Sequence, residues 1–65
     1  MASTVVVNRK KRYKVGYTCS PKEAVVCAFE QFENKNFQTW NYNYTKAKLL
    51  EDGKTWSCGD WVAKL

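Results

Sequence analysis

The stretch SPKEAVVCAFEQF, residues 20–32, decides the fold because it predicts an amphipathic helix. Ser20 and Glu23 form a capping box, in which the serine hydroxyl accepts from the amide of Glu23 and the carboxylate accepts from the amide of Ser20. Pro21 suits the first helical position, where an amide hydrogen has no partner within the helix. We therefore expect a helix that begins at Pro21 and ends around residues 34–36.

One apolar stripe runs along this helix, and a polar side lies opposite. Helical periodicity groups the apolar residues Pro21, Ala24, Val25, Ala28, Phe29 and Phe32 on the stripe. The opposite side holds Lys22, Glu30 and Glu33, so we expect these side chains to face solvent, and Val26 falls on the same side. A helix of this kind buries its stripe against a sheet, so the flanking segments should supply strands.

The segment before the helix alternates with a period of two, which is typical of a half-buried strand. Its two sides are Tyr13, Val15, Tyr17 and Cys19, against Arg12, Lys14, Gly16 and Thr18. Residues 5–7 are three valines, which fit either a preceding strand turned back at residues 8–11 or an ordered tail. We expect residues 1–4 to be disordered.

The segment after the helix predicts a long hairpin. Trp40, Tyr42 and Tyr44 alternate with polar residues, as in a strand, and Asp52-Gly53 is a strong signal for a type I′ turn. Centring the turn on those two residues fixes the register, and apolar cross-strand pairs would stabilise it. The pairs are Leu49 with Trp56, Ala47 with Cys58, Tyr44 with Trp61, Tyr42 with Ala63 and Trp40 with Leu65.

This hairpin contains a conflict of faces. The paired apolar residues are even-numbered within residues 40–44 and odd-numbered within residues 47–49, and neighbouring residues of a strand face opposite sides. The partner strand changes in the same way at Gly59-Asp60. Either a bulge at Gly59 returns the distal half of the hairpin to the core side, or that half presents its apolar pairs away from the helix.

Together these elements predict a single α+β domain over residues 1–65. The expected architecture is a mainly antiparallel sheet of three strands with one α-helix packed on one face, in the order β-α-β-β. Residues 5–7 are the alternative fourth strand. One compact arrangement places the first strand beside the last, in a split βαβ unit. The rings of residues 37–44 then belong mostly to the core, because the other face of the sheet is polar.

The net charge of +5 is confined to one segment. Eleven Lys and Arg residues stand against six Asp and Glu residues, but five of the cations gather within residues 9–14. They are Arg9, Lys10, Lys11, Arg12 and Lys14. Such a segment is either a solvated turn that protects an edge strand from aggregation, or a contact for nucleic-acid phosphates that supplies affinity without sequence specificity.

The residue inventory argues against catalysis, cofactors and metals. The chain has no histidine, and its three cysteines, Cys19, Cys27 and Cys58, form no C-x-x-C motif. A zinc site would need all three thiolates and a carboxylate from scattered positions, whereas free thiols suit a reducing cytoplasm. The apolar runs are far shorter than a membrane span. We expect a cytoplasmic protein that is not an enzyme, holds no cofactor or metal, and contacts no membrane.

The distal end of the hairpin predicts an interaction surface. Leu49 and Trp56 lie beyond easy reach of the helix, and an exposed Trp–Leu pair is typical of a protein-binding or self-association surface, with Lys48 and Lys54 as its polar rim. A local cluster closed by the twist of the sheet is the alternative interpretation. We therefore expect a protein-interaction or self-associating module (an adaptor, inhibitor or homodimer). The alternative function is a small nucleic-acid-binding protein that uses residues 9–14.

Overall fold

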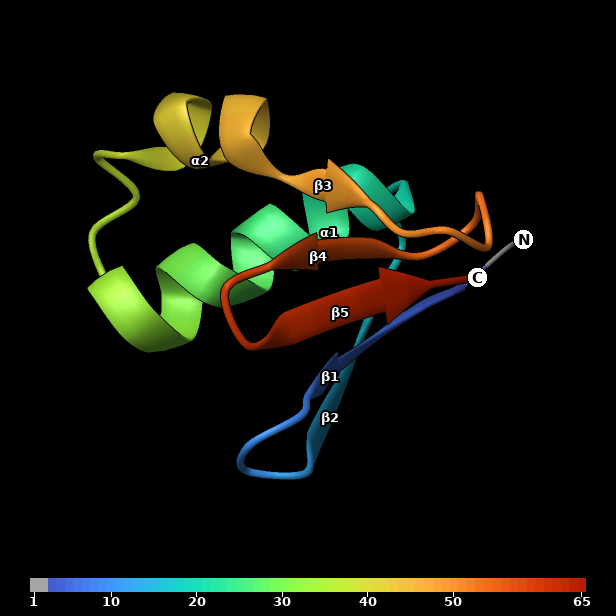
Figure 1. Ribbon diagram of the computed structural model, residues 1–65. Helices are drawn as coiled ribbons and strands as arrows, with labels where there is room; N and C mark the ends of the chain where they lie inside the picture. The colour runs from blue at the N-terminus through green and yellow to red at the C-terminus, as the bar shows by residue number, and fades with distance from the viewer. Residues whose placement is uncertain (1–2) are drawn as a thin grey trace.

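The computed structural model describes residues 3–65 as a five-stranded antiparallel sheet with helices on one side (Figure 1). In chain order the elements are β1 (Thr4–Asn8), β2 (Tyr13–Tyr17), α1 (Pro21–Phe29), η1 (Glu30–Asn34), α2 (Trp40–Lys46), β3 (Lys48–Leu49), β4 (Trp56–Cys58) and β5 (Trp61–Lys64). The predicted α+β class is confirmed. The prediction of three or four strands and one helix is wrong in detail, because a second helix and three short strands replace the predicted long hairpin.

Strand β1 confirms that residues 5–7 form a strand, and it lies inside the sheet, whose order is β2-β1-β5-β4-β3. Because β1 lies between β2 and β5 and pairs with both, these two strands are not neighbours, and the expected arrangement with residues 12–19 beside the last strand is wrong. The disorder predicted for residues 1–4 does not extend to Thr4, whose buried hydroxyl donates to the Cys19 carbonyl at 2.6 Å. Residues 1–2 lie outside the described residues.

Helix α1 begins at Pro21, as predicted, and continues into η1, a wider π-helical turn that ends just before Lys35. The expected capping box does not form. The Ser20 hydroxyl donates to the Glu23 carboxylate at 2.9 Å and makes no hydrogen bond with a backbone amide. Lys35 takes a left-handed conformation with φ 65°, and its amide donates to the Glu30 carbonyl. This reversal ends the helix and turns the chain towards α2.

The strand predicted around Trp40 is wrong, because residues 40–46 form helix α2. Trp40 and Tyr44 are four residues apart, so the helix places them on one side, where their rings stack with centroids 5.0 Å apart. Tyr42 points elsewhere and is 62% exposed, and Phe37 is exposed as well. Alternation over only five residues fits helical i, i+4 spacing as well as a strand. Trp40 and Tyr44 are half-buried and pack against the edge of the core, whereas Phe37 and Tyr42 lie outside it. The expectation that these rings are mostly core is therefore wrong.

Hairpin β3–β4 keeps the predicted register near its turn. Leu49 pairs with Trp56 as predicted. The turn is a loop closed by a hydrogen bond from the Leu50 amide to the Thr55 carbonyl at 2.8 Å. It is not the expected type I′ turn. Such a turn needs a positive φ at both central residues, and in this loop only Gly53 has one. Since the chain before β3 is helical, the other predicted pairs do not form: Ala47–Cys58, Tyr44–Trp61, Tyr42–Ala63 and Trp40–Leu65.

The change of face at Gly59-Asp60 is a second tight turn and not a bulge. It joins β4 to β5, which pair with Cys58 opposite Trp61. Partners across a two-residue turn share one face although they are three positions apart, which explains the change from even to odd numbers. Gly59 has φ 62°, and a Cβ there would lie 2.9 Å from the Phe29 ring. Both the turn and the helix packing therefore require glycine.

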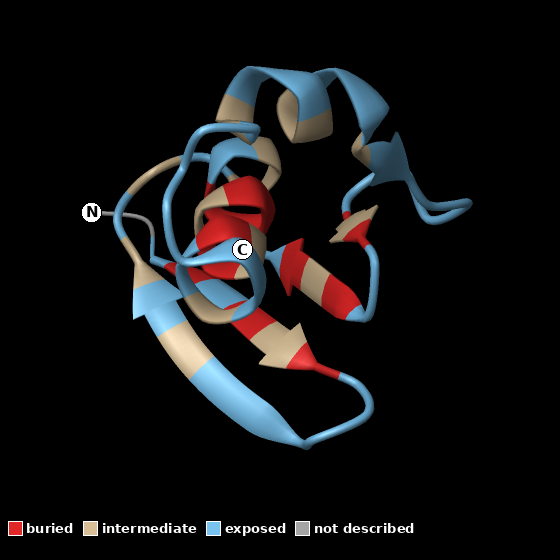
Figure 2. Ribbon diagram, turned by 90° about the vertical axis from the view of Figure 1, so that its left-hand side faces the viewer, coloured by how far each residue is buried: buried red, intermediate tan, exposed pale blue. Residues whose placement is uncertain are grey.

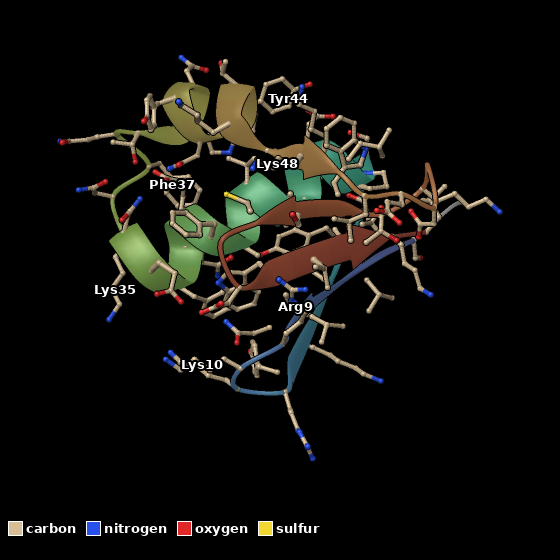
Figure 3. The ribbon with its side chains drawn as sticks, in the orientation of Figure 1. Arg9, Lys10, Lys35, Phe37, Tyr44 and Lys48 are labelled. Atoms are coloured by element: carbon tan, nitrogen blue, oxygen red, sulfur yellow. The ribbon has the colours of Figure 1, made fainter. Side chains whose placement is uncertain are left out.

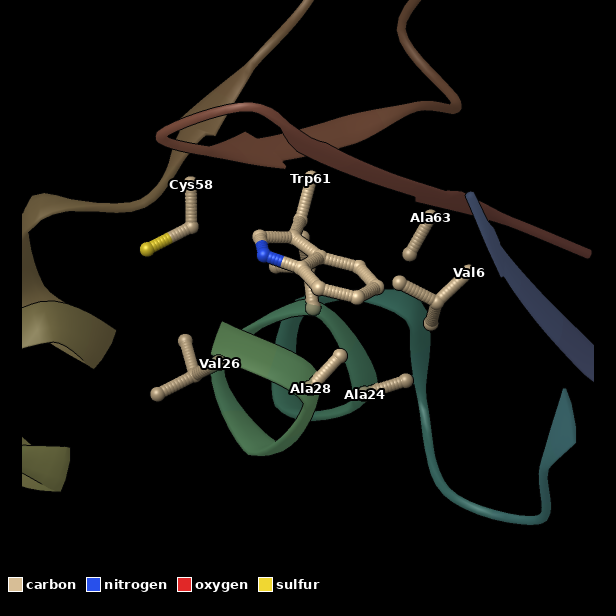
Figure 4. Close-up of a cluster of buried hydrophobic side chains, with 8 residues drawn as sticks. Val6, Ala24, Val26, Ala28, Cys58, Trp61 and Ala63 are labelled. Carbon is tan, nitrogen blue, oxygen red and sulfur yellow. The ribbon is translucent and has the colours of Figure 1, made fainter. Parts of the chain in front are cut away.

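The core lies between the sheet and α1 (Figures 2 and 4). Its largest side chain, Trp61, is only 1% exposed. The other members are Val6, Ala24, Val25, Val26, Ala28, Cys58 and Ala63. Val26 was expected on the polar side of α1, and its burial corrects that expectation. Helix α2 packs against α1, so the sheet, α1 and α2 form three successive layers.

Glu30 is also buried, and the expectation that it faces solvent is wrong. One of its carboxylate oxygens accepts from the side-chain amides of Asn34 and Asn43, each at 2.6 Å. The Thr39 hydroxyl donates to the same oxygen at 2.9 Å. Burial alone would raise the pKa of Glu30, but these hydrogen bonds outweigh burial and lower the pKa. The buried carboxylate therefore ties η1 to α2, whereas Glu33 is exposed as predicted.

Candidate interaction surfaces

The first candidate surface lies at the end of hairpin β3–β4. We call it the hairpin-end surface and define it by Leu49, Leu50, Trp56, Lys48 and Lys54. Leu49 and Leu50 are 49% and 38% exposed, respectively. Trp56 is half-buried and packs against the core, so the two leucines rather than the tryptophan are displayed. Strand β3 has two residues and forms an edge of the sheet. This end of the sheet thus offers two exposed leucines on an open strand edge.

The Lys22 cation lies over both the Trp56 ring and the Tyr44 ring. The Nζ atom of Lys22 lies 4.2 Å from the ring centroid of Tyr44 and 5.0 Å from that of Trp56. A cation in this position is attracted to the faces of the rings. Helix α1 therefore reaches Trp56 through Lys22, which corrects the expectation that the tryptophan lies beyond the helix. Leu49 and Leu50 remain exposed.

The two lysines of the surface are separated. Lys48 pairs with Ser57 and so faces the side of the sheet opposite to Leu49. Lys54 lies in the exposed loop, where its amide donates to the Asp52 carboxylate at 2.9 Å. Hydrogen bonds from the Thr55 hydroxyl and from nearby amides lower the pKa of Asp52 to about 2. Leu50 continues this pairing opposite Thr55, so it lies on the same side of the strand as Lys48, and Lys54 lies in the loop beyond both leucines.

The second candidate surface is the basic segment, residues 9–14, whose five cations are all exposed. Asn8 is buried just before it, and its side-chain oxygen accepts two amides of the segment at 3.0 and 2.7 Å. The Arg12 amide donates to the Asn8 carbonyl at 2.7 Å, and the Arg9 amide donates to the Asp60 carbonyl at 2.9 Å. The basic segment is thus a tied turn between β1 and β2, at the opposite end of the molecule from the hairpin-end surface (Figure 1).

Lys14 extends the basic segment onto the face of the sheet that the helices leave uncovered. It lies opposite Val7, and Lys64 lies opposite Val5. Val62 pairs with Val7 and completes an apolar stripe between the lysines. The expectation that this face carries only polar residues is therefore wrong.

A recess lies beside the basic segment. It has a volume of about 490 Å³ and is lined by Lys11, Tyr13, Phe32, Lys35 and Trp61. Tyr13 is 47% exposed, although its strand pattern assigns it to the core side. Of these five residues the sequence predicted only Lys11 as a site residue: Tyr13 and Trp61 were expected in the core, and Phe32 and Lys35 belong to the helical segment and its end. No periodicity relates them to the basic segment, so only the fold brings the five side chains together.

The cysteines are free. Burial raises the pKa of the Cys58 thiol, and the nearby Glu30 carboxylate raises it further. Burial, followed by the nearby Cys27, raises the pKa of Cys19. A raised pKa keeps a thiol protonated and lowers its reactivity.

Within residues 3–65, no group of three His, Cys, Asp or Glu side chains could hold a metal ion. In the same range, no helix has the length and apolar character needed to cross a membrane. No protein-family model, curated protein or solved structure matches this chain. Its function is therefore inferred from the geometry of its own surfaces.

Proposed function

We propose that this chain is a small, non-enzymatic, cytoplasmic binding module that recognises a protein partner through the hairpin-end surface. The observation that supports this best is the joint exposure of Leu49 and Leu50. Trp56, beside them, is held by the core and by Lys22. Apolar side chains on a pre-ordered base lose little conformational freedom on association, which favours binding.

The proposed partner is a second copy of this chain or another protein that the chain joins or inhibits. As the edge of the sheet, β3 has main-chain groups that are available to pair with a strand of the partner. Two copies of such an edge can pair around a two-fold axis, which gives a symmetric homodimer. In either complex the leucines enter the contact and Lys54 lies at its rim.

Nucleic-acid binding is a second candidate function, and the form of the basic segment supports it. The turn that carries the five exposed cations is held by hydrogen bonds to Asn8. Binding therefore does not have to order a flexible arm, which would cost conformational entropy. Such a turn contacts phosphates and positions a nucleic acid without reading its sequence. Lys14 continues the same charge onto the uncovered face of the sheet.

Self-association provides the first test of the hairpin-end surface. We expect sedimentation equilibrium to show that the mass of the wild-type chain rises towards the dimer with concentration, and that the double variant Leu49→Asp, Leu50→Asp stays monomeric. Tyr42→Asp is the matched control, because Tyr42 is an exposed apolar ring on α2, and it should associate like the wild type. Dimerisation that survives in the double variant would contradict the assignment. A wild type that is monomeric throughout excludes the homodimer and leaves another protein as the partner.

A further inference from the structure

The recess beside the basic segment has two aromatic walls. Tyr13, at the start of β2, meets Phe32 edge to face, with ring centroids 5.2 Å apart and an interplanar angle of 73°. Phe32 in turn stacks on Trp61, with centroids 5.2 Å apart. Because Trp61 is almost completely buried, it gives the two partly exposed rings a rigid support. The exposed parts of Tyr13 and Phe32 therefore form a fixed corner.

Two lysines from different elements stand at the rim of this corner. Lys11 belongs to the tied turn, where its amide donates to the Asn8 side chain at 2.7 Å. Lys35 follows η1, and its amide is bonded to the last turn of the helical segment. Figure 3 shows Lys35 and Lys10 towards the left of the molecule, with Arg9 nearer its middle. The backbone at both rim lysines is thus held in place, and their ammonium groups can reach a ligand that enters the corner.

The charge around the recess is positive in spite of two nearby acids. Glu33 accepts a hydrogen bond from the indole N–H of Trp61 at 3.3 Å. Asp60 lies in the turn whose carbonyl accepts the Arg9 amide. The cations at this end of the molecule are Arg9, Lys10, Lys11, Arg12 and Lys35. A ligand that fits here combines negative charge with a flat, stackable group.

We propose that this recess binds an unpaired nucleotide of a single-stranded nucleic acid. The base stacks on the exposed face of Tyr13 and meets Phe32 at its edge, and the flanking phosphates contact Lys11 and Lys35. The rest of the strand continues over the basic segment. The volume of about 490 Å³ lies within the range of roughly 300–1,000 Å³ that is usual for small-ligand sites.

Single strands are favoured over duplexes and over acidic peptides. A base within a duplex is stacked on both faces by its neighbours and cannot enter the corner. An acidic peptide can neutralise the lysines, but its carboxylates leave the exposed rings without a partner. This inference rests on the nucleic-acid-binding candidate function and is independent of the protein-binding proposal, because the recess and the hairpin-end surface lie at opposite ends of the molecule.

Fluorescence anisotropy with two labelled strands separates stacking from charge. One strand is an oligothymidylate of about ten nucleotides, and the other has the same length and backbone but lacks the bases. We expect the wild-type chain to bind the oligothymidylate roughly 5- to 100-fold more tightly, which is the factor that one or two stacked bases supply. Tyr13→Leu should reduce the affinity for oligothymidylate to that of the base-free strand and leave the affinity for the base-free strand unchanged.

Tyr42→Leu is the matched control. Tyr42 is an exposed tyrosine that also has a lysine beside its ring, with Lys46 Nζ 5.3 Å from the centroid. This variant should bind both strands as the wild type does. Lys11→Gln and Lys35→Gln should weaken binding of both strands, and each should reduce the slope of the salt dependence by about 0.7, the contribution of one phosphate contact to a single strand.

A second measurement covers the case in which Tyr13→Leu does not fold. In a titration of the isotope-labelled wild-type chain with oligothymidylate, the indole signal of Trp61 and the amide signals of Tyr13 and Lys35 should shift. The proposal is overturned by equal affinity for the two strands, by absence of binding at low salt, by equal effects of the two tyrosine variants, or by signal shifts confined to another surface. A polyglutamate peptide that binds as tightly as oligothymidylate would also overturn it and reassign the recess to an acidic protein.

Discussion

Glu30 carries its charge inside the protein because its carboxylate is surrounded by hydrogen-bond donors. A buried carboxylate without donors would be neutralised or would destabilise the fold. Asn34, Thr39 and Asn43 supply the donors, from η1, the connection after it and α2. Helical periodicity within residues 20–32 cannot reveal this burial, because it describes α1 alone and not a second helix that packs on its polar side.

Replacement of Glu30 by Gln should destabilise the fold by about 1–3 kcal/mol, the usual cost of leaving buried donors unsatisfied. A glutamine keeps one acceptor oxygen, but its amide nitrogen is a donor and cannot accept the hydrogen bonds that Asn34, Thr39 and Asn43 donate to the carboxylate. Urea unfolding at neutral pH measures the loss. Glu51→Gln is the control, because Glu51 is exposed in the loop between β3 and β4, and it should leave the free energy of unfolding unchanged. Equal stability of the two variants would contradict the role of Glu30.

The stabilisation by Glu30 should depend on pH in a defined direction. Its pKa in the folded protein is lowered from the ordinary value of 4.5. The stabilisation is therefore complete above that value and is lost as the pH falls through the lower pKa of the folded state. The difference in unfolding free energy between the wild type and Glu30→Gln should shrink in acid. Asp52 titrates in both proteins, so its effect cancels, and the difference in unfolding free energy reports the titration of Glu30 alone. A difference that stays constant from neutral pH into acid would be inconsistent with this explanation.

Gly59 should tolerate alanine worst among the three glycines. Its left-handed φ and the contact with Phe29 together should cost about 2–4 kcal/mol in Gly59→Ala. Gly53 also has a positive φ but no atom near a new Cβ, so Gly53→Ala should cost only about 1–2 kcal/mol. Gly16 has neither constraint, and its alanine variant should stay within about 1 kcal/mol of the wild type. Thermal unfolding of the three variants would show a different order if the β4–β5 turn were misassigned.

At the scale of elements, predictions succeeded where the local pattern is longer than one turn. Helix α1 has a stripe over several turns, and β2 alternates over its whole length, so both were predicted near their actual positions. The register of Leu49 with Trp56 follows from a short connection. Helix α2 was missed, because the spacing of four residues between Trp40 and Tyr44 fits both the period of two of a strand and the period of 3.6 of a helix. The even-to-odd change at Gly59 was visible in the sequence, but it signalled a chain reversal and not a bulge.

The layer order predicts unequal roles for Trp61 and Trp40. Trp61→Ala should cost roughly 3–5 kcal/mol and unfold most of the molecules, because this side chain is the centre of the core. Trp40→Ala should cost less, because the half-buried Trp40 packs only on the outer side of α1, with its indole N–H 3.4 Å from Cys27 Sγ. Hydrogen exchange should then show faster opening of α2 while the sheet stays protected. Equal losses of stability would mean that α2 belongs to the same core as the sheet.

At the scale of the whole molecule, the chain presents two different surfaces at opposite ends of one sheet. The charge concentrated in residues 9–14 is visible in the sequence, and the structure places those cations on one exposed turn. The recess could not be predicted, because Phe32 and Lys35 reach it only through the packing of the helical segment beside β5. The two leucines beside Trp56 follow from the register, but their exposure depends on where α2 ends.

Removal of charge from the basic segment should affect nucleic-acid binding alone. We expect the combined replacement of Arg9, Lys10, Lys11 and Arg12 by Gln to abolish binding of any DNA or RNA strand, with the amide spectrum unchanged. Exposed side chains of a turn contribute little to packing, so the fold should persist. Lys46→Gln and Lys48→Gln together remove charge elsewhere and serve as the control in the same anisotropy titration. Binding by the fourfold variant at moderate salt would exclude the basic segment as the nucleic-acid site.

The most direct test of the proposed function compares the proteins captured from a lysate of the source organism after nuclease treatment. The immobilised chains are the wild type, the Leu49→Asp, Leu50→Asp double variant and Tyr42→Asp. Protein recognition at the hairpin-end surface predicts a nuclease-resistant set of proteins, including this chain itself if it dimerises, that the wild type and Tyr42→Asp retain and the double variant loses. Capture that disappears with nuclease, or that the double variant retains in full, would contradict the claim.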